Sequence, residues 1–167
     1  MTVRFDIEKL GAKHDRSSFD CGSEPLNRYF SQQVTQDIRR RVTACFVALT
    51  SSRAIAGYYT LASASVRLAD LPPDTASKLP RYPSVPAVRM GRLAVGRQFK
   101  GQGLGAALLA DALTRALNSD IAAFALIVDA KDDAAAAFYR HHGFIAFEDN
   151  PRALFLPLAT VKALPRA

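Results

Sequence analysis

The sequence predicts a single α/β domain, residues 1–167, in which helices flank a central sheet. Three observations predict it. The chain has 167 residues, enough for one hydrophobic core and too few for two comfortable ones. Segments of strand-like composition and segments of helical period follow one another along the chain. No repeat and no linker interrupts this pattern, so we expect one continuous domain.

The N-terminal third predicts a strand followed by a helix. Residues 3–10, VRFDIEKL, alternate as a strand does. After a polar segment, Ser23 is a suitable N-cap for a helix that runs to the arginines at 39–41. The apolar residues on one face of this helix are Leu26, Tyr29, Phe30 and Val34. This spacing predicts a helix that buries one face.

A hairpin and a long loop come next. Residues 43–50 and 54–66 are rich in β-branched and aromatic side chains, which predicts two strands joined by a turn at 50–54. Residues 68–86 hold most of the chain's prolines and predict a long loop. Loops of this length are usually functional or disordered.

The second half predicts alternating strands and helices. We expect strands at 88–95, 124–130, 144–149 and 154–158, and helices at 104–119 and 132–143. The strand FALIVDA is apolar on both faces, which is typical of a fully covered strand. Gly143 is a suitable stop for the second helix.

Composition narrows the classes of function. The formal net charge is +7 with a pI near 9.8, which favours phosphate-bearing partners, a cofactor or a nucleic acid. The apolar runs are shorter than the roughly 20 residues that a membrane helix needs. Two cysteines and three histidines give neither a disulfide framework nor a metal site, and we expect buried reduced thiols. These features predict a cytoplasmic protein that binds no metal.

The segment RQFKGQGLG, residues 97–105, places three glycines directly before a strong helix. A glycine turn lets the main chain approach a ligand closely, and the N–H groups of the following helix face that ligand. Such a turn binds phosphate or pyrophosphate. The spacing fits neither a P-loop nor a dinucleotide fingerprint, and a plain glycine turn before a helix remains an alternative.

A second motif makes the glycine segment more specific. Gln98-x-x-Gly101-x-Gly103 is followed about thirty residues later by D-x-x-A-x-x-F-Y-x-x-x-G-F, which ends at Phe144. Together with the preceding strand RLAV, these motifs resemble the GCN5-related N-acetyltransferase (GNAT) superfamily. The resemblance spans the chain and implies the GNAT fold, a central mixed, mostly antiparallel sheet flanked by helices, and one acetyltransferase domain over residues 1–167.

The GNAT resemblance implies acetyl-CoA as the cofactor. The residues that it assigns to cofactor binding are Leu93, Ala94, Val95, Gln98, Lys100, Gly101, Gly103, Leu104, Gly105 and Asp132. The glycine segment would hold the pyrophosphate, and the strand end at 93–95 would bond the pantetheine arm. The family often has asparagine at the position of Asp132, and that residue has an equally good role as a helix cap.

Tyr139 is the catalytic residue that the resemblance implies. In the family a tyrosine at this position sits beside the departing sulfur, and a phenol can protonate the CoA thiolate. No general base is evident, because the strand at 88–95 offers arginines where a carboxylate would be useful and His141 and His142 are expected to face solvent. Without a base, the acceptor should be an amine that is largely neutral near pH 7. The α-amine of an aminoacyl ester is such a group.

A closer resemblance supports this acceptor. The segments DRSSFDCGSEPLNRYF, GYYTLASASV, LPRYPSVPAVRMGRLAV and ALFLPL look like the GNAT toxins of bacterial type II toxin–antitoxin modules. This similarity implies a toxin that acetylates the α-amino group of aminoacyl-tRNA and blocks translation. It also implies a homodimer, a ribbon-helix-helix antitoxin as partner and no contact with a membrane.

Basic residues are candidates for tRNA contact. Arginines that can reach tRNA phosphates are Arg39, Arg40, Arg41, Arg89 and Arg92. A solvated helix end with charges that complement the helix dipole explains the run at 39–41 equally well.

Two other functions remain open from the sequence. One is a GNAT enzyme acting on a small amine or a protein N-terminus. The other is a non-catalytic nucleic-acid-binding module whose glycine turn only holds phosphate.

Overall fold

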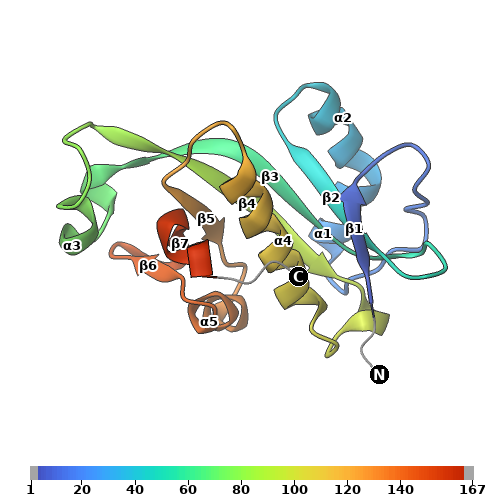
Figure 1. Ribbon diagram of the computed structural model, residues 1–167. Helices are drawn as coiled ribbons and strands as arrows, with labels where there is room; N and C mark the ends of the chain where they lie inside the picture. The colour runs from blue at the N-terminus through green and yellow to red at the C-terminus, as the bar shows by residue number, and fades with distance from the viewer. Residues whose placement is uncertain (1–3, 164–167) are drawn as a thin grey trace. The chain divides into compact units, whose positions relative to one another are not determined.

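The computed structural model describes residues 4–163 and divides into two compact units. Unit 1 comprises Met1–Ala62 and Gly91–Ala112, and unit 2 comprises Ser63–Met90 and Leu113–Ala167. Strands β3 (Ile55–Arg67) and β4 (Ser84–Val95) and helix α4 (Leu104–Asn118) run from one unit into the other. The course of the chain is traced in Figure 1. The single domain remains a prediction.

The described strands form a seven-stranded sheet in the order β1-β2-β3-β4-β5-β7-β6. Its remaining strands are β1 (Asp6–Lys9), β2 (Ala44–Leu49), β5 (Ala125–Asp129), β6 (Ile145–Phe147) and β7 (Asn150–Pro157). Strands β4 and β5 pair in parallel, whereas β1–β2, β2–β3, β5–β7 and β6–β7 are antiparallel. The predicted mixed, mostly antiparallel sheet is therefore confirmed.

In unit 1 the predicted N-terminal helix contains an irregular turn. Helices α1 (Glu24–Arg28) and α2 (Val34–Arg39) follow each other through a π turn at Tyr29–Gln33. A π turn widens the helix by one residue and is frequent at functional sites. Its Tyr29 and Phe30 are buried and pack with Tyr58 of β3 in the core of this unit. The hairpin of β2 and β3 is confirmed, with its turn at residues 50–54.

A close approach in unit 1 fixes the first part of α4 against the sheet. A Cβ atom at Gly57 of β3 would lie 2.8 Å from the carbonyl oxygen of Ala94 and 3.0 Å from Cδ1 of Leu108. Contacts this short with backbone do not occur for real Cβ atoms. Only glycine therefore lets β3, the end of β4 and the start of α4 pack this closely.

Unit 2 is built around the parallel pair of β4 and β5. Ala87–Met90 pair with Ala125–Val128, and all four residues of that β5 segment are buried. Helix α5 (Asp133–His141) follows β5, and β7 pairs with the other edge of β5. The expected burial of FALIVDA on both faces is thus confirmed in its central residues.

The proline-rich segment 68–86 is more ordered than the loop expected from its sequence. It contains a 3-10 turn at Leu68–Asp70 and helix α3 (Pro73–Ala76), and β4 begins at Ser84 rather than at residue 88. Leu71 and Val85 are buried in the core of unit 2. A segment rich in proline is predicted to be a loop from its local backbone preferences alone. Here the packing of Leu71 and Val85 against distant residues gives the segment an ordered structure that these preferences do not predict.

Two smaller expectations concern the thiols and the membrane. Cys21 and Cys45 are free and buried, as predicted, and burial raises the pKa of Cys45 to about 12. Within the part of the chain that the structure describes, no helix combines the length and apolarity needed to cross a membrane.

Candidate active site

The glycine segment forms an open turn before α4. After β4, a 3-10 turn at Arg97–Phe99 leads to Gly101 and Gly103, whose φ angles are +79° and +80°. These angles favour glycine because other residues are strained there. No heavy atom outside the neighbouring residues lies within 4 Å of the place that a Cβ would take at either glycine. The main chain is therefore open to a ligand at the start of a 15-residue helix.

Hydrogen bonds to distant segments hold the entry to this turn. The Gly96 N–H donates to the Ala56 carbonyl at 2.7 Å, and the Arg97 N–H donates to the Asp20 carbonyl at 2.8 Å. The Asn27 amide and the Gly22 N–H lower the pKa of Asp20, with smaller contributions from Arg97 and Lys100. Asp20 also pairs with Arg97 at 3.4 Å, whereas Lys100 forms no ion pair with a carboxylate of the described residues.

The other residues assigned to the cofactor lie on both sides of this turn. Gln98, Lys100, Gly101 and Gly103 are exposed, Leu104 is buried, and Gly105 is half-buried. Ala94 is buried, while Leu93 and Val95 are half-buried. The register of β4 with β5 ends at Met90, so residues 93–95 lie beyond this pairing. Their contacts with pantetheine stay a prediction.

Tyr139 is a buried residue of α5 in unit 2, only 6% exposed. Its ring packs against Phe144, with 5.4 Å between ring centroids. Burial raises the pKa of Tyr139 well above its usual 10.0, and the negative charge of Asp129 raises it further. Because the raised pKa favours the neutral form, the hydroxyl keeps its proton at neutral pH and is available as a donor.

Asp132 caps α5, which is one of the two roles expected for it from the sequence. Its carboxylate accepts a hydrogen bond from the Ala135 N–H at 2.8 Å. A contact of Asp132 with the pantetheine arm stays a prediction. His141 and His142 are exposed at the end of the same helix, as expected.

The three arginines at the end of α2 are exposed, and one has an unusual backbone. The Val42 N–H donates to the Asp37 carbonyl and the Arg41 N–H to the Ile38 carbonyl, which is the Schellman pattern of a helix end. Arg41 occupies the position where glycine is preferred, with φ +60°. A charged side chain is thus kept at a backbone angle that costs about 1 kcal/mol.

The two arginines of β4 are engaged by side chains within their own units. Arg89 forms a close ion pair with Asp129 in unit 2. In unit 1, the guanidinium of Arg92 stacks over the Tyr29 ring. Both contacts were missed from the sequence, because the partners come from distant segments. A role of these arginines in tRNA binding stays a prediction.

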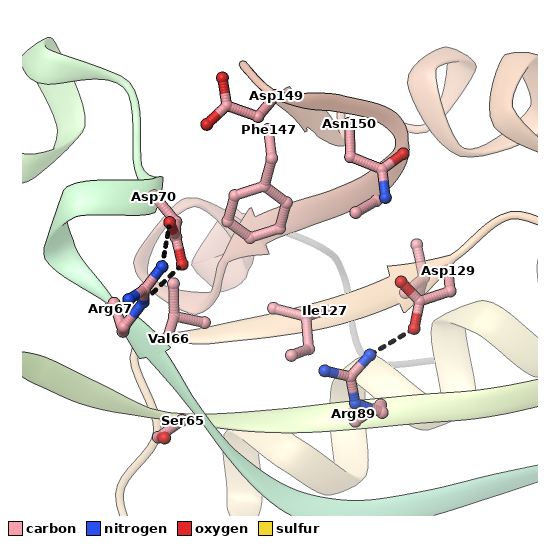
Figure 2. Close-up of a pocket in the computed structure, with 12 residues that line it drawn as sticks. Ser65, Val66, Arg67, Asp70, Arg89, Ile127, Asp129, Phe147, Asp149 and Asn150 are labelled. Atoms are coloured by element: carbon pink, nitrogen blue, oxygen red, sulfur yellow. Dashed lines mark hydrogen bonds and ion pairs between the residues drawn. The ribbon is translucent and has the colours of Figure 1, made fainter.

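Unit 2 contains a pocket of about 440 Å³. Figure 2 shows its lining, with the side chains of Arg89 and Asp129 directed toward each other. The lining residues are Ser65, Val66, Arg67, Asp70, Arg89, Ile127, Val128, Asp129, Phe147, Asp149, Asn150 and Ala153. Sequence reasoning singled out only Arg89 among them. A charged residue at the end of an otherwise apolar strand, Asp129 in FALIVDA, was the available signal.

Comparison with known families identifies the fold and the class of enzyme. The model of the acetyltransferase (GNAT) domain family matches residues 19–155. The chain belongs to this family, and it is an acetyltransferase that uses acetyl-CoA as its cosubstrate. The GNAT resemblance predicted from the two motifs is confirmed.

Individual relatives match nearly end to end. The chain is 35% identical over 158 residues to a tRNA-acetylating toxin of Mycobacterium tuberculosis, covering 93% of each chain. A structure of AtaT complexed with acetyl-methionyl-tRNAfMet is 33% identical and has a TM-score of 0.87, covering 95% of this chain and 98% of that one. A mutant AtaT toxin bound to the C-terminus of the antitoxin AtaR and acetyl-CoA is 28% identical, with a TM-score of 0.80 and coverage of 95% and 96%. The predicted resemblance to the toxin branch is confirmed.

Proposed function

We propose that this chain is a toxin that transfers acetyl from acetyl-CoA to the α-amino group of aminoacyl-tRNA and so blocks translation. The observation that carries the proposal is the similarity to a tRNA-acetylating toxin over 93% of both chains. An aminoacyl-tRNA whose α-amine is acetylated cannot take part in peptide-bond formation as an acceptor.

The glycine turn is the proposed pyrophosphate site. Its fit rests on the open space over Gly101 and Gly103, on the first-turn N–H groups of α4 and on the exposed Lys100. Bound there, acetyl-CoA supplies an activated acetyl thioester. The main chain of Leu93–Val95 is the proposed partner of the pantetheine arm.

Tyr139 is the proposed proton donor to the departing sulfur. Its raised pKa keeps the hydroxyl protonated at neutral pH. The α-amine next to an ester is largely neutral near pH 7 because the ester withdraws electrons, so the attack itself needs no strong base.

The arginines at the end of α2 are proposed to contact tRNA phosphates. They are exposed, and the strained backbone at Arg41 supports a role for its side chain, because strain of this kind gathers at functional sites. Charge reversal across Arg39–Arg41 should weaken tRNA binding and flatten its salt dependence. Unchanged binding across a salt titration would exclude these residues from the tRNA interface.

The partners follow from the same toxin resemblance. We propose a homodimer that is neutralised by a small antitoxin of the ribbon-helix-helix type and acts in the cytoplasm. An antitoxin bound to the toxin occurs in the AtaT relative, and the type of antitoxin and the dimer are testable by co-expression and by measuring the mass in solution.

The deciding experiment is transfer of labelled acetyl from acetyl-CoA to a charged total-tRNA pool. Uncharged tRNA and the Tyr139→Phe protein serve as controls. Label on charged tRNA alone, lost in the variant, supports the toxin function and allows the acetylated tRNA to be identified. No label on any tRNA, with acetyl-CoA still bound, overturns it.

The second candidate is a GNAT enzyme for a small amine or a protein N-terminus. A screen of such acceptors tests it when no tRNA is labelled. The net charge of +7 disfavours polycationic acceptors through repulsion. Membership of an acetyltransferase family disfavours the non-catalytic nucleic-acid-binding module.

A further inference from the structure

The pocket of unit 2 has a charge balance opposite to that of the chain. Its lining carries two arginines and three aspartates, so it is net negative in a protein whose net charge is +7. Each arginine already has a carboxylate partner, Arg67 with Asp70 and Arg89 with Asp129. A phosphate would meet three carboxylates here, whereas an amine or ammonium group would find acceptors. The pocket suits an amine rather than the tRNA backbone.

The wall between the two ion pairs is apolar. Val66 and Ile127 are buried, at 5% and 4% exposure, and Phe147 packs against the core cluster to which both belong. A pocket with an apolar wall and a few polar groups is the usual form of a small-ligand site, and 440 Å³ lies within the usual size range. The pocket can therefore bind a ligand that carries both an amine and an apolar group.

Asp129 is the carboxylate best placed to receive that amine. It ends β5, two residues after Ile127 and on the same face of the strand. Its side chain is 60% exposed, so it retains accessible lone pairs while Arg89 offsets its charge. Such a carboxylate can accept a hydrogen bond from the N–H of a neutral amine. It binds the amine in this way without taking up the proton that the amine loses on acetylation.

Asp129 also acts electrostatically on the predicted catalytic tyrosine. Its charge is the second cause, after burial, of the raised pKa of Tyr139. Both residues belong to unit 2, so an amine bound at Asp129 lies in the same unit as the group that is proposed to protonate the leaving sulfur.

We propose that this pocket receives the aminoacyl end of the tRNA, with the α-amine bound to Asp129 and the amino-acid side chain on the wall formed by Val66, Ile127 and Phe147. The inference rests on the proposed function and adds the acceptor site to it. Asp129 is a substrate-binding residue in this arrangement, and Arg89 is a positioning residue that acts through it.

The test uses Asp129→Asn in the 167-residue chain, with Asp133→Asn as the matched control. Asp133 is an exposed aspartate of the same unit that pairs with Arg152 at 3.1 Å and does not line the pocket. We expect Asp129→Asn to raise KM for charged tRNA roughly five- to tenfold, because it replaces a charged acceptor with a neutral amide oxygen, whose hydrogen bonds are about half as strong. The Kd values for acetyl-CoA and uncharged tRNA should not change, and Asp133→Asn should match wild type throughout.

A chemical probe separates the amine from the rest of the substrate. Methionine methyl ester should inhibit wild-type transfer, and the methyl ester of the matching 2-hydroxy acid, which lacks the amine, should inhibit it less. Asp129→Asn should lose this preference. Equal inhibition by both esters, or equal KM values for Asp129→Asn and Asp133→Asn, overturns the pocket proposal. Absence of transfer to charged tRNA by wild type instead overturns the proposed function.

Discussion

The guanidinium carbon of Arg92 lies 3.3 Å from the centre of the Tyr29 ring. The Tyr29 hydroxyl donates to Asp37 at 2.7 Å, and Asp37 also accepts from Gln33 at 3.0 Å. Both hydrogen bonds connect the π turn at Tyr29–Gln33 to α2. Arg92, which lies on β4, stacks on the ring of Tyr29, the first residue of this turn. The arginine thus fixes the irregular turn of the N-terminal helix.

We expect Arg92→Ala to lower the free energy of unfolding, because it removes a partly buried cation–π contact of about 1–2 kcal/mol. A double-mutant cycle with Tyr29→Leu, measured by urea unfolding, isolates this contact. A coupling energy of about 0.5 kcal/mol or more is the expected result. Additive effects of the two substitutions would show that the stacked geometry contributes nothing to stability.

The contact of Arg92 marks the limit of sequence reasoning for this chain. Gly101 and Gly103 were identified because a glycine turn before a helix is a local pattern, and their φ angles bear out the need for glycine. Asp129 and Tyr29 were not identified as functional or structural partners, because Arg89 and Arg92 reach them from distant segments. The burial of Leu71 within a proline-rich stretch was missed for the same reason.

Gly103→Ala should separate stability from cofactor binding. A Cβ there meets no neighbouring atom within 4 Å, so the loss of stability should be limited to the strained φ, about 1–2 kcal/mol. The methyl group would occupy the space proposed for the pyrophosphate, so the Kd for acetyl-CoA should rise about tenfold or more.

Gly11→Ala is the control for this prediction. Gly11 lies in an exposed turn, and a Cβ there would come no closer than 4.0 Å to the His14 ring. Calorimetric titration of both variants with acetyl-CoA gives the comparison. An unchanged Kd for folded Gly103→Ala would remove this turn from the cofactor site.

Tyr139→Phe should abolish acetyl transfer while acetyl-CoA still binds. The variant keeps the buried ring and its packing against Phe144 and loses only the hydroxyl. The raised pKa of Tyr139 keeps its proton bound as the pH rises past 10, so ionisation of this residue should not limit the wild-type rate below pH 10. The dependence of the wild-type rate on pH, measured from pH 6 to 10, should show no decrease caused by ionisation of Tyr139. Turnover by Tyr139→Phe at the wild-type rate would refute the catalytic role.

Arg41→Gly should weaken tRNA binding without a loss of stability. Glycine at this Schellman position relieves the φ of +60°, so the free energy of unfolding should hold or rise by up to about 1 kcal/mol. If Arg41 contacts a phosphate, tRNA affinity falls and the slope of log K against log salt becomes shallower by about 0.7–0.9. Arg39→Gly, within the helix, should instead destabilise the protein. Unaltered affinity in Arg41→Gly would mean that its strained backbone serves another purpose.

Glu8 should give unit 1 a stability that disappears in acid. Its carboxylate accepts hydrogen bonds from His14 at 2.7 Å and from Arg53 at 2.8 Å. The Gly11 N–H donates to Nδ1 of the His14 ring, which leaves Nε2 to donate to Glu8. The His14 hydrogen bond is the largest cause that lowers the pKa of Glu8 from 4.5 to about 2, with Lys13 and Arg53 adding to it.

The sign of the pH dependence follows from this lowered pKa. The folded state holds Glu8 ionised more strongly than the unfolded chain does, so its contribution is complete above about pH 4.5 and is lost as the pH falls toward 2. Urea unfolding of Glu8→Gln should therefore differ from wild type at pH 7 and converge with it on acidification. Glu24→Gln, which breaks an exposed pair at 3.5 Å with Arg28, should differ little at any pH. A constant gap between Glu8→Gln and wild type from pH 7 to pH 2.5 would show that packing, rather than the charge of Glu8, stabilises the strand β1.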